Sequence, residues 1–431
     1  MPPDLTVRAR RVVLPDGTAP AVVTITDGRI AAVDAYGASV DGPVVDLGAD
    51  EVLLPGLVDT HVHGSCAGPT TSAVAAAGGV TTLVEMPLHA DPPTVDPDAL
   101  AARRAAARGE VAVDVGFWGA AVPVRGGLPD PAGRVDAGRL TALAQAGVRG
   151  FACVLTDTGV PGFPPVGHED LETAAATCAS LGLPLLVHAE DDGVLSDAPP
   201  AGPDLRSFLA SRPPGAETTA VLRLATLASR TGAHVHVLHV SAFEAAEEIG
   251  AARHAGVPLT AETCPHHLAL ASETLPGTVG KSLPPVRSES NRELLWGALG
   301  AGRLDAVVSD HSVRPPEPAD RGFDAAYAGM PSLGITLPLV WSGAAARGHT
   351  LDDVVGWMAA APARLAGLPA KGAIEVGRDA DLVVLAPDEV AEVDPGVPGG
   401  SPYAGLALRG VVRRVWLRGT EAPAAGGGAL L

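Results

Sequence analysis

The segment Pro55-Gly-Leu-Val-Asp-Thr-His-Val-His63 joins a short apolar run to two histidines that are two residues apart. Side chains alternate between the two faces of a strand, so His61 and His63 share one face if residues 57–63 are extended. Two imidazoles on one face can bind the same cation. The segment therefore predicts a buried strand that ends in part of a divalent-metal site.

Imidazoles and a carboxylate recur at the ends of later apolar runs. His188 ends Leu185-Leu-Val-His188, His239 lies in Val235-His-Val-Leu-His239, and Asp310 follows Val307-Val-Ser309. These are ligand types that zinc and related ions bind. Any one of these histidines could instead be a structural residue, but the recurrence of five such residues at predicted strand ends favours a shared metal site.

Alternation along the strands separates some histidines from others. It places His239 on the face of Val235 and Val237, and it turns His234 and His236 to the opposite face. A metal in such a site lowers the pKa of bound water towards about 7, and Asp310 could then accept the proton as general base. His266 and His267 follow another strand, and one of them could line the same pocket.

Apolar runs alternate with alanine-rich helical stretches through the middle of the chain. This alternation predicts right-handed crossovers and a parallel sheet. We therefore expect an α/β fold, a (β/α)8 TIM barrel over residues 55–364, with its active site at the carboxyl ends of the strands. The expected strands cover residues 57–63, 81–86, 111–118, 150–155, 184–188, 234–240, 259–264 and 305–310.

Both ends of the chain have a different character. Residues 7–14, 21–26 and 30–33 are strand-like and are separated by Asp-Gly turns, and residues 380–385 and 408–418 return to this pattern. We predict that residues 1–54 and 365–431 form one composite β-sandwich module. The last ten residues, rich in glycine and alanine, are expected to be frayed.

Composition excludes several partners. The 431 residues are 47% hydrophobic and 18% charged, with a formal net charge of −19, so a large core is expected, and neither nucleic acid nor anionic membrane is an expected partner. No secretion signal or membrane-spanning run is visible. The cysteines form no C-x-x-C pair and predict reduced thiols in a cytoplasmic protein; they are Cys66, Cys153, Cys178 and Cys264.

Nine stretches resemble the amidohydrolase superfamily, in particular its cyclic-amide branch of allantoinases, hydantoinases and dihydroorotases, and the allantoinases most. They occur in the family's order over nearly the whole chain: Pro55–His63 as quoted above, Ala77-Gly-Gly-Val-Thr-Thr-Leu-Val-Glu-Met-Pro-Leu88, Asp114-Val-Gly-Phe-Trp-Gly119, Val187-His-Ala-Glu190, Val237-Leu-His-Val-Ser241, Glu262-Thr-Cys-Pro-His-His-Leu268, Lys281-Ser-Leu-Pro-Pro-Val-Arg287, Val308-Ser-Asp-His-Ser312 and Gly377-Arg-Asp-Ala-Asp-Leu-Val-Val384.

This resemblance implies hydrolysis of a cyclic amide or ureide in a homodimer or homotetramer. It implies that five residues bind metal and that two of them, Asp310 and His239, also have catalytic roles. The expected substrate-binding residues are His89, His266 and Pro284. The implied ligands are His61, His63, His188, His239 and Asp310.

The chain departs from the family at one expected ligand. The family bridges two metals with a carboxylated lysine, and the matching run here is Gly150-Phe-Ala-Cys-Val154, so Ala152 stands in the lysine position. Alternation turns Cys153 away from that face, and the chain's two lysines, Lys281 and Lys371, lie in a loop and in the tail. Without an anionic bridge, two dications about 3.5–4 Å apart repel each other strongly.

We therefore predict one Zn²⁺ per chain, held by His61, His63 and Asp310 with help from His188, while His239 is either a ligand or a hydrogen-bond partner of the substrate. A second departure is the loop 64–70, which is shorter than in the family and lacks its arginine, and His89 replaces the family's asparagine. These changes predict an altered substrate. Two alternatives stay open: a repurposed enzyme, such as a deaminase or a ring-forming enzyme, and an inactive paralogue.

Overall fold

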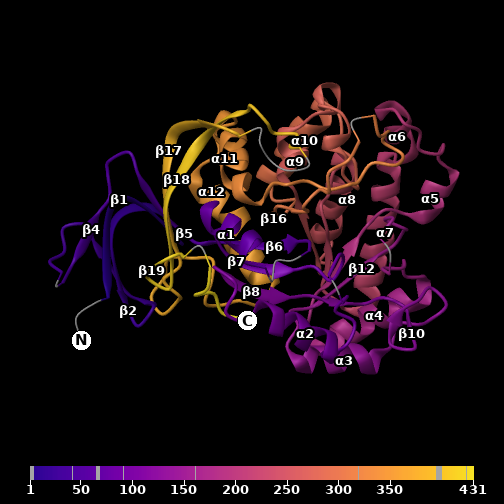
Figure 1. The fold of residues 1–431 in the computed structure, drawn as a ribbon, viewed down its shortest axis with the longest axis horizontal. Helices are drawn as coiled ribbons and strands as arrows, with labels where there is room; N and C mark the ends of the chain where they lie inside the picture. The colour runs from indigo at the N-terminus through magenta and orange to yellow at the C-terminus, as the bar shows by residue number, and fades with distance from the viewer. Residues whose placement is uncertain are drawn as a thin grey trace.

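The computed structural model describes residues 4–40, 42–64, 68–90, 92–160, 162–318, 320–394, 400–423 and 425–431. Two bodies are visible in Figure 1, a β module that contains both ends of the chain and a larger barrel surrounded by helices. No helix in the described ranges is long and apolar enough to cross a membrane.

The barrel is a ring of parallel strands, as the alternating sequence pattern predicts. Strands β6, β7 and β8 form one arc, and β9 and β12 to β16 form the other. Within the described residues the strands are β6 (Leu57–Val62), β7 (Val80–Glu85), β8 (Asp114–Phe117), β9 (Gly119–Ala120), β12 (Phe151–Val154), β13 (Leu185–His188), β14 (Val235–Val237), β15 (Leu259–Thr263) and β16 (Ala306–Val307).

Two contacts close the ring. Strands β8 and β9 are separated only by Trp118, so a single segment pairs with β7 first and with β12 next. On the other side, His311 pairs with Val62, and the amide of His63 donates to the carbonyl of His311 at 2.8 Å. The closed ring confirms the predicted TIM barrel and brings the ends of its first and last strands together.

Helices follow the barrel strands and cover their outer face (Figure 1). They are α1 (Pro69–Ala77), α2 (Pro97–Ala107), α3 (Ala137–Ala146), α4 (His168–Leu181), α5 (Asp192–Asp197), α6 (Leu205–Ser211), α7 (Pro214–Thr231), α8 (Phe243–His254), α9 (Pro265–Ala269), α10 (Glu289–Gly300), α11 (Thr336–Ala346), α12 (Leu351–Val355) and α13 (Ala361–Leu365). A short hairpin, β10 (Val124–Arg125) with β11 (Leu128–Pro129), follows β9.

The β module joins the two ends of the chain, as predicted. Its sheet has the order β19-β18-β17-β5-β1-β2-β3, with β4 beside β1, and one apolar core contains side chains from both ends. The strands are β1 (Leu5–Leu14), β2 (Gly17–Thr26), β3 (Arg29–Ala35), β4 (Val44–Asp46), β5 (Val52–Pro55), β17 (Leu382–Glu392), β18 (Ala407–Leu417) and β19 (Thr420–Glu421).

The expectation that the last ten residues fray is wrong. The amide of Leu431 donates to the carbonyl of Val115, and the amide of Ala429 donates to the Asp114 carboxylate at 2.7 Å. Arg418 also pairs with Asp114. Backbone hydrogen bonds and one buried carboxylate therefore fix the tail against β8, although glycine and alanine supply few side-chain contacts.

Candidate metal centre

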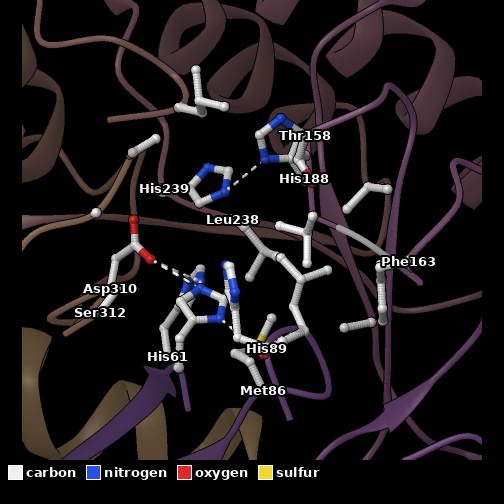
Figure 2. Close-up of a pocket in the computed structure, with 18 of the residues that line it drawn as sticks. His61, Met86, His89, Thr158, Phe163, His188, Leu238, His239, Asp310 and Ser312 are labelled. Carbon is white, nitrogen blue, oxygen red and sulfur yellow. Dashed lines mark hydrogen bonds and ion pairs between the residues drawn. The ribbon is translucent and has the colours of Figure 1, made fainter. Parts of the chain in front are cut away.

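Three of the predicted ligands come from the point where the barrel ring closes. His61 lies in β6, His63 follows it, and Asp310 lies three residues beyond β16. Asp310 has a positive φ of 47°, an unusual conformation for a residue with a side chain. The chain turns at Asp310, and its carboxylate points at His61 in Figure 2 and also lies close to His63.

The distances among these side chains fit one cation. His61 Nε2 is 3.2 Å from His63 Nε2, and Asp310 Oδ1 is 3.3 Å from the former and 3.2 Å from the latter. Ligand atoms bound tetrahedrally to zinc at about 2.0–2.1 Å lie about 3.3 Å from one another. The two imidazoles and the carboxylate are thus spaced as the ligands of one zinc ion would be.

His188 and His239 form a separate pair in the same cavity. His188 Nδ1 lies 3.0 Å from His239 Nε2, as the dashed line in Figure 2 marks. The ring of His239 is 5.3 Å from that of His61, centre to centre. Among the described residues, His61, His63 and Asp310 form a group that could hold one metal ion, and neither His188 nor His239 belongs to it. The predicted contribution of His188 to this metal site is therefore not seen in the geometry.

His239 reaches the cavity by a route that alternation does not predict. Strand β14 ends at Val237, and Val235 and Val237 pack in the outer core, away from the cavity. His239 has a positive φ of 36°, which breaks the alternation and turns its ring inward. His236 remains in the strand and faces a carboxylate inside the barrel.

Two buried glutamates orient the imidazoles, although the sequence alone assigned a role to neither. Glu262 of β15 contacts His61 Nδ1 at 2.5 Å, and Glu190 contacts His188 Nε2 at 2.9 Å. Arg212 pairs with Glu190 in turn. A carboxylate accepts hydrogen bonds only, so each glutamate directs the opposite nitrogen of its histidine towards the cavity.

The histidines and carboxylates of this cluster strongly shift one another's pKa values. Burial alone would raise the pKa of Asp310, but His61, His63 and His239 hold it well below its usual range. Burial alone would lower the pKa of His61, yet Asp310 and Glu262 raise it to about 9. The pKa of Glu262 falls to about 2 because His61 and His236 outweigh the effect of burial. The cluster thus favours positive charge at its centre.

The cavity beside this cluster contains all five predicted ligands and has an apolar wall (Figure 2). The wall is made by side chains from the segment after β7, from β12 and the loop after it, from the segment after β14 and from the segment before α10. No lysine or arginine among the described residues lines it. The apolar residues include Met86, Leu88, Ala152, Val154, Val160, Phe163, Leu238 and Leu283.

The position of the missing lysine lies on this wall. Ala152 packs with Met86 and Leu238 inside the barrel, whereas the Cys153 side chain belongs to the outer core, where burial and Cys178 raise its pKa. Lys281 donates to the carbonyl of Ala326, and Lys371 pairs with aspartates at the module interface. Neither lysine lines the cavity.

The three predicted substrate-binding residues lie at different depths. His89 lines the cavity near solvent, with its ring 5.4 Å from that of His63, and partial burial and His63 lower its pKa to about 4. His266 is fully buried behind Asp310, with its Nε2 4.0 Å from Oδ2. Pro284 is buried next to Leu283 and does not line the cavity, whereas Ser282 and Leu283 do.

Part of the shortened loop after His63 lies outside the described residues, as does Cys66.

Tyr327 also lies near the cavity, and the sequence did not predict a role for it. Its hydroxyl is 2.6 Å from that of Ser312, and its ring is 5.9 Å from that of His89. No sequence pattern singles out Tyr327, because its position depends on the irregular segment after β16.

Comparison with known proteins identifies relatives over the whole chain. Residues 52–422 match the model of the Amidohydrolase family. An allantoinase of Streptomyces avermitilis is 45% identical over 98% of this chain and 96% of its own length. The allantoinase of Arabidopsis thaliana is 36% identical over 96% and 87%, respectively.

Solved structures give the same grouping. An L-hydantoinase (dihydropyrimidinase) from Arthrobacter aurescens superposes with a TM-score of 0.89 at 29% identity, covering 100% of this chain and 97% of its own. A dihydropyrimidinase from Brevibacillus agri superposes with a TM-score of 0.86 at 26% identity, covering 99% and 98%.

Proposed function

The chain belongs to the amidohydrolase family, and we propose that it hydrolyses a carbon–nitrogen bond of a cyclic amide or ureide with a single divalent metal ion, Zn²⁺. It is an allantoinase-like cyclic amidohydrolase. The observation that carries the proposal is the spacing of His61, His63 and Asp310, whose ligand atoms are 3.2–3.3 Å apart.

In this proposal His61, His63 and Asp310 would hold the cation through the imidazole nitrogens and the carboxylate oxygen that face one another. A divalent cation held there would polarise the ring carbonyl and would supply the hydrolytic water at neutral pH. Asp310 accepts a proton at its carboxylate during attack and returns it to the leaving ring nitrogen. His239, whose Nδ1 has no hydrogen-bond partner among the described residues, would contact the ring in this proposal.

The apolar wall favours one class of ring substituent. Allantoin carries a polar ureido group, which would need hydrogen-bond partners on the surface that it contacts. Met86, Val154 and Phe163 offer none. Hydantoins with an apolar group on the ring carbon are therefore a second candidate substrate class beside allantoin.

A substrate panel tests this function. Zinc-loaded protein is assayed for ring opening on allantoin, 5-methylhydantoin, 5-benzylhydantoin and dihydrouracil. We expect turnover of at least one ring, and a loss of about 10³-fold or more in kcat for Asp310→Asn, which removes the proton acceptor. Wild-type protein that binds zinc but opens no ring on the panel would favour the repurposed or inactive alternatives.

Other expectations from the sequence stay predictions. They are the division into residues 55–364 and 1–54 with 365–431, a homodimer or homotetramer, and a cytoplasmic location. Light scattering of the purified protein measures the assembly directly, and a monomer would contradict the expected oligomer.

A further inference from the structure

A row of hydrogen bonds crosses the barrel from the candidate metal centre to its opposite end. It starts at His61 and passes through Glu262, since His61 Nδ1 and His236 Nε2 contact the two oxygens of that carboxylate at 2.5 and 3.0 Å. His236 Nδ1 then contacts the Thr260 hydroxyl at 2.8 Å, which in turn lies 2.8 Å from His234 Nε2.

The far end of this row lies at the amino ends of the barrel strands. His234, His236 and Thr260 line a second cavity there, together with Asp305 and with residues of α13 that cover this end. Residues at this end of a barrel ordinarily contribute to stability, because the active site is at the other end. Here they are linked to a candidate ligand through groups that are almost fully buried, since His61, His236 and Glu262 are each at most 1% exposed.

Donor and acceptor roles along the row follow from the Glu262 carboxylate. An ionised carboxylate only accepts, so His61 donates from Nδ1 and His236 donates from Nε2. A neutral His236 then accepts at Nδ1 from the Thr260 hydroxyl, and the oxygen of Thr260 accepts from His234 Nε2. When His61 loses its Nε2 proton to bind a metal, this arrangement leaves the lone pair on Nε2, the atom that faces His63 and Asp310.

We propose that His236 and Thr260, supported by His234, are positioning residues that hold Glu262 in the orientation in which it presents His61 to the metal. Without a donor at His236, one oxygen of a buried carboxylate loses its partner, and Glu262 can rotate away from His61. Partners behind a metal-bound histidine commonly change metal affinity by 10- to 100-fold when they are lost. This inference rests on the proposed metal site.

The test measures zinc affinity by competition with a chromophoric chelator, together with urea unfolding of the metal-free proteins. His236→Phe keeps a ring of similar size and removes the donor, and we expect zinc to bind about 10- to 100-fold more weakly. Thr260→Val removes the hydroxyl and should weaken binding about three- to ten-fold. Thr260→Ser restores the hydroxyl and should bind zinc within about two-fold of wild type.

His254→Phe is a matched control, because this exposed histidine at the end of α8 has no part in the row. A purely structural role predicts lower unfolding midpoints with unchanged zinc affinity of the folded variants, and that result would overturn the inference. If His236→Phe does not fold, the comparison of Thr260→Val with Thr260→Ser decides. Wild-type protein without measurable zinc affinity would instead contradict the proposed function.

Discussion

Ala152 is the residue on which the proposed metal count depends most. Its side chain packs with Met86 and Leu238 on the cavity wall, on the side of the barrel strand that faces the interior. No described lysine reaches the cavity to replace the missing one. The His188–His239 pair therefore adds two imidazoles to the cavity but no anion that could offset a second dication, because Glu190, which contacts His188, does not line the cavity.

Ala152→Lys should restore a second metal. In bicarbonate buffer a carboxylated lysine at this position would supply the anionic bridge that offsets repulsion between two cations. We expect bound zinc to rise from about one to about two equivalents per chain, measured by plasma emission after desalting. Ala152→Met, which has a similar length and no charge, should remain at one, and equal values for the two variants would count against the role assigned to position 152.

His89 is the second residue for which we expect a specific effect, in this case on the choice of substrate. Its ring lies at the cavity mouth between those of His63 and Tyr327, and its pKa of about 4 leaves it neutral at pH 7. His89→Asn removes the ring and introduces an amide donor. We expect the ratio of kcat/KM for allantoin to that for 5-benzylhydantoin to rise about five-fold or more, with zinc affinity unchanged. An unchanged ratio would remove His89 from substrate selection.

At the scale of elements, the strands could be predicted because buried parallel strands are apolar runs bounded by glycine and proline. The exact ends of the strands could not be predicted, because they depend on individual backbone turns. His239 lies after the end of β14, where a positive φ reverses its direction. Glu262 was missed because its role depends on neighbours from two other strands, which alternation within one strand cannot reveal.

A buried ion-pair cluster joins the β module to the barrel. Lys371 lies 2.6 Å from Asp114 of β8, 2.7 Å from Asp381 and 3.0 Å from Asp379. Removing one partner of a buried pair leaves uncompensated charge. We expect Lys371→Met to lower the free energy of unfolding by about 3 kcal/mol in urea titrations.

A double variant separates charge from packing in this cluster. Asp381→Asn in the Lys371→Met background should recover part of the lost stability, because it removes one carboxylate that no longer faces a cation. If the loss of unfolding free energy in the double variant equals the sum of the losses in the two single variants, Lys371 and Asp381 are not coupled.

At the scale of the whole molecule, buried neutral histidines make stability depend on pH. Burial lowers the pKa of His266 and His311 to about 4, and burial together with His236 does the same for His234. Between pH 6.5 and 4 the unfolded chain therefore binds protons that the folded chain does not. Stability must fall as the pH drops through this window.

His234 offers a test away from the metal centre. In His234→Gln one of these titrating groups is absent, while a side-chain donor near Thr260 is retained. The loss of unfolding free energy between pH 7.5 and 5 should be smaller than in wild type by about 1 kcal/mol. An identical loss in both proteins would show that His234 is not held neutral in the folded state.

We propose that His61, His63 and Asp310 hold a single metal ion, because Ala152 stands where the family resemblance implies a bridging lysine. Zinc content per chain tests it most directly, measured on wild-type protein and on His61→Ala after exposure to excess zinc and desalting. We expect about one equivalent in wild type and a loss of nearly all of it in the variant. Two equivalents in wild type, or one equivalent retained without His61, would contradict the claim.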